Sequence, residues 1–422
     1  MSRPRNKSNP TFVLLEDLVS PPNPLRAAAI GLAPTFPDHG TISLFLRFQG
    51  ISPVDARRLA KAVRRCGGWS ESRHSESSLS AGLPPFSRAA FVEELERKAD
   101  SEVPLTAEIL QALRAARRED RLWKLPGRTL RLREECLIQG ILNVTPDSFH
   151  DGGRWATPRR AIARGLQMEE EGAAMIDVGG ESTRPGSLPV SVDAELRRVM
   201  PVIESLRSKL RIPISIDTTK AEVARRAVQA GASVINDVSG LTFDPAMAGI
   251  AAEHRSGLIL SHIRGRPRTM MRKPRYRHLV PEVVGFLQES VRAARVAGVA
   301  AESILVDPGL GFGKTAVHNL LLLHYLRALH STGCPILVGA SRKSFLRRIL
   351  GEGEDRRLYG SLAVAAVAAM QGAAVLRVHD IAPTVAVLRV VQAVRHSALE
   401  ARGRGRRDKQ AVHPAASRAV KW

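Results

Sequence analysis

The sequence predicts an α/β protein built around a (β/α)8 barrel, the TIM-barrel architecture, with a smaller α/β domain at the amino end. Eight short apolar runs recur in the last two-thirds of the chain, and helical patterns separate them over the length of about 250 residues that such a barrel needs. The runs begin at Cys136, Ala173, Pro213, Ser233, Gly257, Ile304, Pro335 and Ala373. Each is apolar without alternation, which is typical of a strand buried on both faces of a parallel sheet.

The segments between the runs carry helix signals. After the third run, Thr219 opens the segment KAEVARRAVQAG and Gly231 closes it, with Ala224, Ala227 and Val228 on one apolar stripe. Strand and helix therefore alternate eight times along this part of the sequence. An open, doubly wound sheet would alternate in the same way, but the sequence lacks the glycine-rich dinucleotide turn after the first strand. We therefore rank that architecture second.

The chain of 422 residues is longer than one barrel. We expect a small amino-terminal α/β domain over 1–129, the barrel over 130–400, and a basic, disordered tail over 401–422. The first part shows no motif that performs chemistry, and we expect it to serve packing or oligomer contacts.

Within the amino-terminal part, the alternation between Ile42 and Phe48 predicts a strand. Ser52 and Pro53 then begin a helix that Gly67 ends. Further helices are expected over 87–99 and 106–118, with no role assigned to them.

The cysteines and the amino terminus indicate a cytoplasmic protein that does not enter a membrane. Cys66, Cys136 and Cys334 are far apart and form no CxxC pair, so we expect no disulfide. The first residues are basic but lead into no sustained apolar segment of a secretory signal. The longest apolar stretch, SLAVAAVAAM, is too short to span a bilayer and is typical of a barrel helix.

The formal net charge of +22 raises the possibility of nucleic-acid binding. Specific binding needs a basic patch together with an element that reads bases, whereas here Arg is spread widely and aromatic residues make up only 4%. We interpret the charge as diffuse, with a modest benefit for anionic substrates, and expect no specific nucleic-acid partner.

Polar residues follow the strands, and a barrel of this kind builds its active site at the carboxyl ends of its strands. The first strand ends at Asn143, and its side-chain amide could orient a metal or an anion. A loop rich in Pro and Gly follows. After the second strand, Arg184 presents a fork of donors suited to an oxyanion, and Thr183 precedes it. We interpret Asp177 as structural and Glu181 as holding the loop by pairing with an Arg.

The next strand ends carry acceptors, and the last two carry cations. The acceptors are Asp217, Asn236, Asp237 and Asp307. Together they suit a heterocycle rich in N–H groups, held within an apolar rim. The cations and the accompanying imidazole are Lys343, Arg377 and His379. Because Arg377 and His379 alternate with Val378 they face the same side, which suits a two-pronged anion clamp; an internal ion-pair network is the alternative.

The segment GLGFGKT is not a nucleotide-binding phosphate loop. That motif requires Gly five residues before Gly313, and Pro308 stands there.

Six motifs, in this order, resemble the dihydropteroate synthases of folate biosynthesis: NVTPDSF, DVGGESTRPG, SIDTTKAEVARRAVQAGASVINDVSG, DPGLGFGKT, GASRKSF and RVHD. The resemblance runs from about Cys136 to about Arg395. It implies a transferase that joins 6-hydroxymethyl-7,8-dihydropterin pyrophosphate to p-aminobenzoate and releases pyrophosphate with Mg²⁺. It also implies a homodimer and a sulfonamide target.

The resemblance further implies roles for individual residues. Those expected to hold the pterin are Asp217, Asn236, Asp307 and Lys343. Those expected to hold pyrophosphate are Asn143, Arg184, Arg377 and His379, with Asn143 also beside Mg²⁺. Those expected to form the p-aminobenzoate site are Phe149, Thr183, Pro185, Phe312, Lys343 and Ser344. Those expected to lower the barrier are Asp307, Lys343, Arg377 and His379.

Three positions depart from the family pattern. His150 stands where Ser is common, so an effect on closure of the first loop is expected. Ser261 and Ile263 stand where Met is common on either side of a histidine, and these changes would alter the apolar wall under the pterin.

Two other functions compete with this interpretation. A methyltetrahydrofolate-binding methyltransferase shares the barrel and its pterin-binding carboxylates, but it has no need of the anion clamp or of the STRPG loop. A pterin-binding or nucleic-acid-binding protein without turnover is favoured only by the basic charge.

Overall fold

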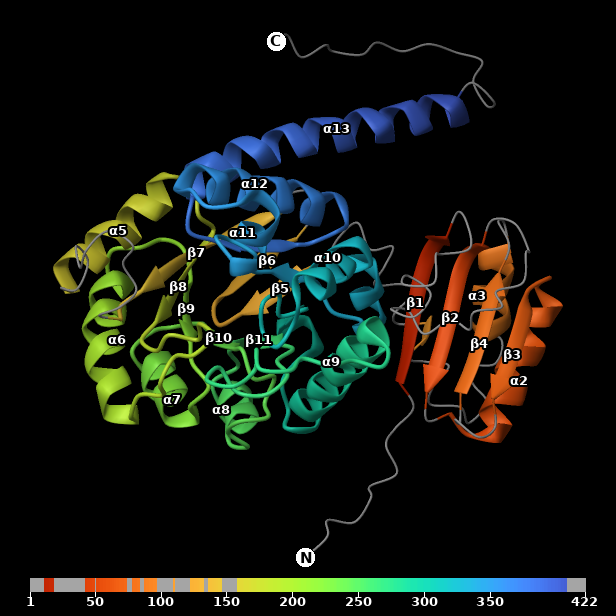
Figure 1. The fold of residues 1–422 in the computed structure, drawn as a ribbon, viewed down its shortest axis with the longest axis horizontal. Helices are drawn as coiled ribbons and strands as arrows, with labels where there is room; N and C mark the ends of the chain where they lie inside the picture. Colours follow the sequence, from red (N-terminus) through yellow and green to blue (C-terminus); the bar gives the residue numbers. More distant parts are fainter. Residues whose placement is uncertain are drawn as a thin grey trace, which may run out of the picture.

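A closed barrel of eight parallel strands forms the larger part of the protein (Figure 1). The computed structural model describes residues 11–18, 42–49, 51–73, 78–83, 87–96, 109–110, 122–132, 136–145 and 158–407. The barrel strands are β7 (Leu137–Asn143), β8 (Met175–Gly179), β9 (Ile214–Asp217), β10 (Val234–Asp237), β11 (Gly257–Ser261), β12 (Ile304–Asp307), β13 (Leu337–Val338) and β14 (Val375–Val378). Neighbouring strands pair in parallel, and a bridge between Val306 and Ile336 closes the ring. The predicted (β/α)8 barrel is confirmed.

Helices follow the strands and surround the barrel (Figure 1). They are α5 (Pro158–Glu170), α6 (Val192–Arg207), α7 (Ala221–Gln229), α8 (Met247–Glu253), α9 (Leu279–Val296), α10 (Ala316–His324), α11 (Ser344–Leu350), α12 (Glu354–Met370) and α13 (Ile381–Arg407), with 3₁₀ turns η2 (Ala301–Ser303) and η3 (Leu326–Thr332). The helix predicted after Thr219 is α7, and its apolar residues Ala224 and Ala227 are fully buried. Gly231 follows it with a φ of 116°, a left-handed conformation that favours glycine.

Each barrel strand buries both faces but divides its residues between two cores. On β8, Ile176 and Val178 join the core between barrel and helices, whereas Met175 joins the core inside the barrel. This explains why the strand sequences are apolar without alternation. The inward face changes from apolar at the amino end, as at Met175, to polar at the carboxyl end, as at Asp177. The strand direction therefore places the polar side chains at one mouth.

A β-hairpin closes the opposite end of the barrel. Strands β5 (Leu122–Leu125) and β6 (Arg128–Arg131) pair antiparallel. Trp123 is fully buried, packs with the amino-end core, and donates a 2.9 Å hydrogen bond from Nε1 to the Ser303 carbonyl. A Cβ on Gly257 would lie 2.4 Å from Leu125, so the glycine makes room for the hairpin. We propose that the barrel unit begins before Leu122 rather than at residue 130.

The described residues of the amino-terminal domain form a four-stranded antiparallel sheet together with helices. Its strands, in the order β1-β2-β4-β3, are β1 (Thr11–Leu18), β2 (Ile42–Gln49), β3 (Trp69–Arg73) and β4 (Ser78–Leu83), and its helices are α2 (Pro53–Arg65) and α3 (Ser87–Glu96). The predicted small α/β region is confirmed, as are the strand at β2 and the helix capped by Ser52. Of the helix expected over 106–118, only residues 109–110 are described.

The sheet of this domain contacts the barrel. Strand β1 packs against α9 and η3, and Phe45 of β2 joins the barrel's outer core, while Leu46 and Phe48 pack in the domain's own core. Because successive residues of a strand face opposite sides, β2 serves both cores. The alternation from Ile42 to Phe48 predicts the strand β2 but not its contact with the barrel, and β1 was not predicted.

The carboxyl-terminal helix is longer than expected. Helix α13 extends to Arg407, so the predicted disorder is corrected for residues 401–407, while 408–422 lie outside the described residues. This stretch contains Gly403 and Gly405, which disfavour a helix, beside Ala and four Arg, which favour one. Among the described residues, no helix is long and apolar enough to cross a membrane. No disulfide joins Cys66, Cys136 or Cys334, all of which lie among the described residues.

Candidate active site

Charged side chains from four strands meet at the carboxyl mouth of the barrel. The Arg377 guanidinium, on β14, donates from Nε to Asp177 Oδ2 at 2.6 Å and from Nη2 to Asp217 Oδ2 at 2.6 Å. Asn236, on β10, donates from Nδ2 to the same Asp177 oxygen at 3.0 Å. Three of these residues were expected at the site, and Asp177 was interpreted as structural. Its position at the centre of the network could have been inferred from its inward register on β8.

Burial makes the two aspartates unusual. Asp177 is 0% and Asp217 6% exposed, and the Oδ1 atom of each has no hydrogen-bond partner among the described residues. Burial raises the pKa of Asp217 to about 7, although the Arg377 cation opposes the rise. The site therefore holds oxygen acceptors that are removed from water and available to N–H donors of a ligand.

Asp307 lies at the end of β12 in a similar environment. Its Oδ1 accepts a 2.7 Å hydrogen bond from the Gly309 backbone N–H, and burial raises its pKa, opposed by that hydrogen bond and by Lys343. A Cβ on Gly339 would lie 3.6 Å from Asp307 Oδ2 and 3.7 Å from the Arg377 Cβ. The glycine thus leaves the space between these two residues open.

Lys343 and Phe312 form one wall of the mouth. The Lys343 ammonium lies 4.0 Å from the centre of the Phe312 ring. Burial, with Arg377 nearby, lowers the pKa of Lys343 to about 8. Phe312 itself packs with a small apolar cluster that includes Ile263, one of the positions that departs from the family pattern. The expected apolar wall is therefore present, with an isoleucine in it.

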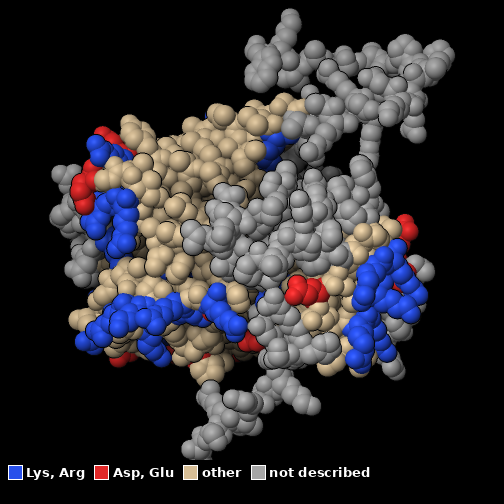
Figure 2. Space-filling view, turned by 45° about the vertical axis from the view of Figure 1, so that its right-hand side comes forward, with Lys and Arg blue, Asp and Glu red and all other residues tan. Residues whose placement is uncertain are grey.

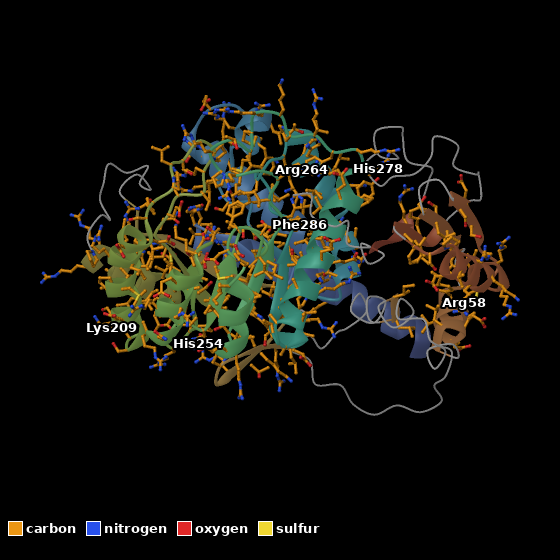
Figure 3. All side chains as sticks on the ribbon, turned by 90° about the horizontal axis from the view of Figure 1, so that it is seen from below. Arg58, Lys209, His254, Arg264, His278 and Phe286 are labelled. Atoms are coloured by element: carbon orange, nitrogen blue, oxygen red, sulfur yellow. The ribbon has the colours of Figure 1, made fainter. Side chains whose placement is uncertain are left out.

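Lys314 is a buried lysine that holds the backbone behind this wall. It is 1% exposed, and its Nζ lies 2.7 Å from His262 Nδ1 and donates to the carbonyls of His262, Gly309 and Phe312 at 3.0–3.2 Å. Burial lowers its pKa well below the ordinary value. The His262 ring also packs edge-on against Phe286 of α9, with ring centres 4.8 Å apart; Phe286 is labelled in Figure 3. Lys314 binds backbone and imidazole, in agreement with the exclusion of a phosphate loop.

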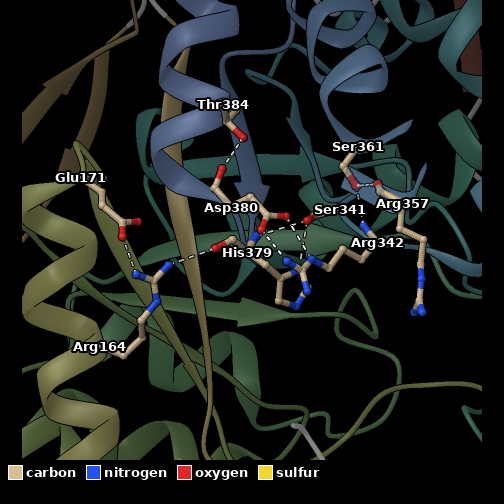
Figure 4. A network of polar contacts seen from close by, with 9 residues as sticks. All are labelled: Arg164, Glu171, Ser341, Arg342, Arg357, Ser361, His379, Asp380 and Thr384. Atoms are coloured by element: carbon tan, nitrogen blue, oxygen red, sulfur yellow. Dashed lines mark hydrogen bonds and ion pairs between the residues drawn. The ribbon is translucent and has the colours of Figure 1, made fainter. Parts of the chain in front are cut away.

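A second network fixes the ends of β13 and β14 (Figure 4). Ser341 Oγ accepts from the His379 backbone N–H at 3.2 Å and lies 3.0 Å from His379 Nδ1. Arg342 has a left-handed φ of 56° and forks onto Asp380 with hydrogen bonds of 3.0 and 2.6 Å. Burial and nearby cations, Arg377 first, lower the pKa of His379 to about 3. His379 is therefore uncharged at neutral pH, so in the expected anion clamp it would contribute a hydrogen bond rather than a charge.

The loop after β8 is held at its base by a buried charge cluster. Lys220 pairs with Glu181 and, at 2.5 Å, with the fully buried Glu195 of α6. Glu181 thus pairs with a lysine rather than with the arginine expected. Further along this loop, the Gly186 N–H donates to the Pro267 carbonyl at 3.0 Å, which joins it to the loop after β11.

The remaining expected residues occupy different positions around the mouth. Asn143 Oδ1 and Asp217 Oδ2 lie 3.3 and 3.6 Å from the point that a Cβ on Gly179 would occupy, so both face this gap. Asp237 is structural, because its carboxylate accepts the backbone N–H groups of Ser239 and Leu241.

Residues of the expected p-aminobenzoate site are described in part. Arg184, Pro185 and Ser344 are exposed and Thr183 is half-buried. The Arg184 cation contributes to lowering the pKa of both Lys343 and His379, which indicates that it lies on their side of the mouth. Phe149 and His150 lie outside the described residues.

Comparison with known proteins identifies the family. Residues 139–379 match the family described as pterin binding enzyme. A dihydropteroate synthase of Synechocystis is 47% identical over 258 residues, which cover 61% of this chain and 89% of the relative. The chain belongs to the pterin binding enzyme family, as a dihydropteroate synthase.

Solved dihydropteroate synthases share the fold of the barrel. The Yersinia pestis enzyme in complex with a sulfonamide drug is 41% identical, with a TM-score of 0.63 over 65% of this chain and 99% of its own. The Xanthomonas albilineans enzyme with 4-aminobenzoic acid is 45% identical, with a TM-score of 0.61 over 65% of this chain and 98% of its own. This dihydropteroate synthase thus carries an amino-terminal extension outside the family match.

Proposed function

We propose that this dihydropteroate synthase joins 6-hydroxymethyl-7,8-dihydropterin pyrophosphate to p-aminobenzoate, giving 7,8-dihydropteroate and pyrophosphate. The amine nitrogen of p-aminobenzoate attacks the methylene carbon, the carbon–oxygen bond to pyrophosphate breaks, and the amine loses a proton. The observation that carries the proposal is the meeting of buried acceptors with Lys343 and Arg377 at one mouth. A solved relative that holds 4-aminobenzoic acid supports the second substrate.

In this proposal the pterin ring donates its N–H groups to the buried acceptors. These residues are Asp217, Asn236 and Asp307, with Lys343 beside them. Positive charge develops on the pterin methylene as pyrophosphate leaves, and the Asp307 carboxylate offsets it. The pyrophosphate is held by the two guanidinium groups of Arg377 and Arg184 and by a hydrogen bond from His379.

Mg²⁺ fits the oxygen atoms at this mouth. Asn143 Oδ1 faces the gap beside Gly179, and hard oxygen donors are the ligands that Mg²⁺ prefers. Among the described residues no group of three His, Cys, Asp or Glu is arranged to hold a metal. Asn143 would therefore hold the ion together with the substrate's phosphate oxygens, and the ion would offset the charge of the leaving pyrophosphate.

For p-aminobenzoate, we propose that the ring lies against Phe312 and the stem of Lys343, near Ser344. Thr183, Pro185 and Phe149 would complete this subsite from the two loops. The exposed positions of Pro185 and Ser344 are compatible with a second substrate that enters last, from solvent.

We also propose a homodimer through the outer face of α12 and α13. On α12 the exposed residues Tyr359, Ala363, Val367 and Met370 follow one another at intervals of three and four and form an apolar stripe. Val390 on α13 is 66% exposed. Exposed apolar surface of this kind is typical of subunit contacts. Light scattering of wild type and of Val367→Asp checks the state, with the monomer expected for the variant.

The competing functions receive less support. The anion-binding set at Arg377 favours a synthase over a methyltransferase. On the face shown in Figure 2, Lys and Arg of the described residues form separate groups rather than one continuous surface. Three cysteines that form no disulfide are compatible with the cytoplasmic location that we expect.

Pyrophosphate release by the purified full-length protein tests the proposed function. With Mg²⁺ and pterin pyrophosphate, release should require p-aminobenzoate and should match the dihydropteroate formed. Release that is independent of p-aminobenzoate would indicate a hydrolase instead.

A further inference from the structure

Two carboxylates occupy the donors of Arg377. Asp177 accepts a hydrogen bond from Nε and Asp217 accepts one from Nη2, each at 2.6 Å, and both carboxylates are buried. Charge-assisted hydrogen bonds of this length are strong when water is excluded. In the ligand-free protein, the guanidinium is therefore already neutralised.

This arrangement conflicts with the roles that the proposed function assigns. There, Asp217 accepts from the pterin ring and Arg377 holds the pyrophosphate, yet the structure joins these two residues to each other. Asp217 Oδ1 is open to the ring, but a carboxylate that shares its charge between Arg377 and the pterin binds each of them less strongly than it would bind one alone. A guanidinium that loses its carboxylate in a buried site needs another anion.

We propose that Arg377 exchanges Asp217 for the pyrophosphate when the pterin ring enters, while Asp177 retains its Nε. The inference rests on the proposed function. Asp177 is then a positioning residue: its Oδ2 also accepts from Asn236 at 3.0 Å, so it is fixed from the pterin side. Rotation about the retained Nε contact turns the terminal nitrogens towards the anion.

The exchange makes the two halves of the substrate bind cooperatively. The pterin ring removes the carboxylate that competes with the anion, and by reciprocity the anion frees Asp217 for the ring. Couplings between ligand sites commonly amount to about 5–150-fold in affinity. An unreacted pterin and free pyrophosphate should therefore each strengthen the binding of the other.

Calorimetric titration of pyrophosphate, with Mg²⁺, into the full-length protein tests this with and without 6-hydroxymethylpterin. We expect the pterin to raise the pyrophosphate affinity of the wild type at least about fivefold. Asp217→Asn removes the competing charge, so it should bind pyrophosphate more tightly than wild type without pterin and gain nothing from pterin. The control Glu222→Gln removes a carboxylate from the exposed face of α7 and should behave as wild type.

Two results would overturn the exchange: Asp217→Asn binding pyrophosphate no more tightly than wild type, or a wild type that turns over normally but binds the two ligands independently. A wild type without turnover would instead contradict the proposed function. If Asp217→Asn does not fold, Asp177→Asn provides the second measurement. It should raise the KM for pterin pyrophosphate at least about fivefold, with the KM for p-aminobenzoate unchanged. An unchanged ratio of the two KM values in a folded Asp177→Asn would overturn the positioning role.

Discussion

Ser341 Oγ accepts the backbone N–H of His379 at 3.2 Å and lies 3.0 Å from the Nδ1 of the same residue. The backbone N–H uses one of the two acceptor sites of the hydroxyl, so the same oxygen holds both the backbone and the ring of His379 in place. Burial and nearby cations lower the pKa of His379 to about 3, which leaves its imidazole uncharged at neutral pH. Its contribution to anion binding is one hydrogen bond rather than a charge.

The lowered pKa of His379 predicts a specific acid sensitivity. Its pKa falls from the ordinary 6.5 to about 3, so between these values the unfolded chain binds the proton and the native protein does not. The resulting stability is present above pH 6.5 and is lost as the pH falls towards 3. The melting temperature should therefore fall less in His379→Gln than in wild type between pH 7 and pH 5, with a difference of about 2–4 °C. Identical acid profiles of the two proteins would contradict the neutral assignment.

Asp217 predicts a pH dependence of catalysis. Its pKa is raised to about 7, so a pterin that requires the carboxylate binds better as the pH rises through that value. We expect kcat/KM for pterin pyrophosphate to rise on the acid side with an apparent pKa near 7, and Asp217→Asn to abolish that rise. The profile of kcat/KM between pH 5 and pH 9 checks this, and a rise that persists in Asp217→Asn would assign the titration to another group.

The fork between Arg342 and Asp380 predicts that an arginine is required at this position. Lysine keeps the charge but cannot donate two parallel hydrogen bonds, so the β13 loop that carries Lys343 loses its anchor to β14. Arg342→Lys should lower kcat/KM about tenfold, the loss expected for one such interaction of about 1–2 kcal/mol. Arg347→Lys, on the exposed surface of α11, is the matched control and should leave kcat/KM unchanged.

The hydrogen bonds of the buried Lys314 side chain should stabilise the backbone that carries Phe312. Lys314→Met leaves the carbonyls of His262, Gly309 and Phe312 without their donor, which should cost about 3 kcal/mol of unfolding free energy. We also expect the KM for p-aminobenzoate to rise, because Phe312 loses its backbone anchor. Urea unfolding and steady-state kinetics measure both. The exposed Lys209→Met, labelled in Figure 3, should change neither.

The hairpin predicts where the barrel can be truncated. Trp123→Ala removes a fully buried indole from the floor of the barrel, a change that commonly costs about 3–5 kcal/mol. The neighbouring Leu122 is 44% exposed, so Leu122→Ala should cost under about 0.5 kcal/mol. A chain that starts at Leu130 should unfold at a lower temperature than one that starts at residue 120. Equal melting temperatures would show that the hairpin contributes no stability.

The barrel and the positions of its strand-end residues follow from the sequence alone. Unalternated apolar runs need burial on both faces, and strand polarity places Asp217, Asn236, Asp307 and Arg377 at one mouth. This is local information, because period and direction are properties of each segment by itself. The family motifs are equally local.

Contacts between distant segments were decided only by the tertiary structure. The sequence does not indicate that Asp177 and Asp217 share one guanidinium, that Lys220 rather than an arginine pairs with Glu181, or that Trp123 lies under the barrel. The charge state of His379 depends on burial and on cations from other strands, which no local pattern encodes. Pairing and desolvation are properties of the assembled site, so the sequence determined which groups reach the mouth and the fold decided how they are coupled there.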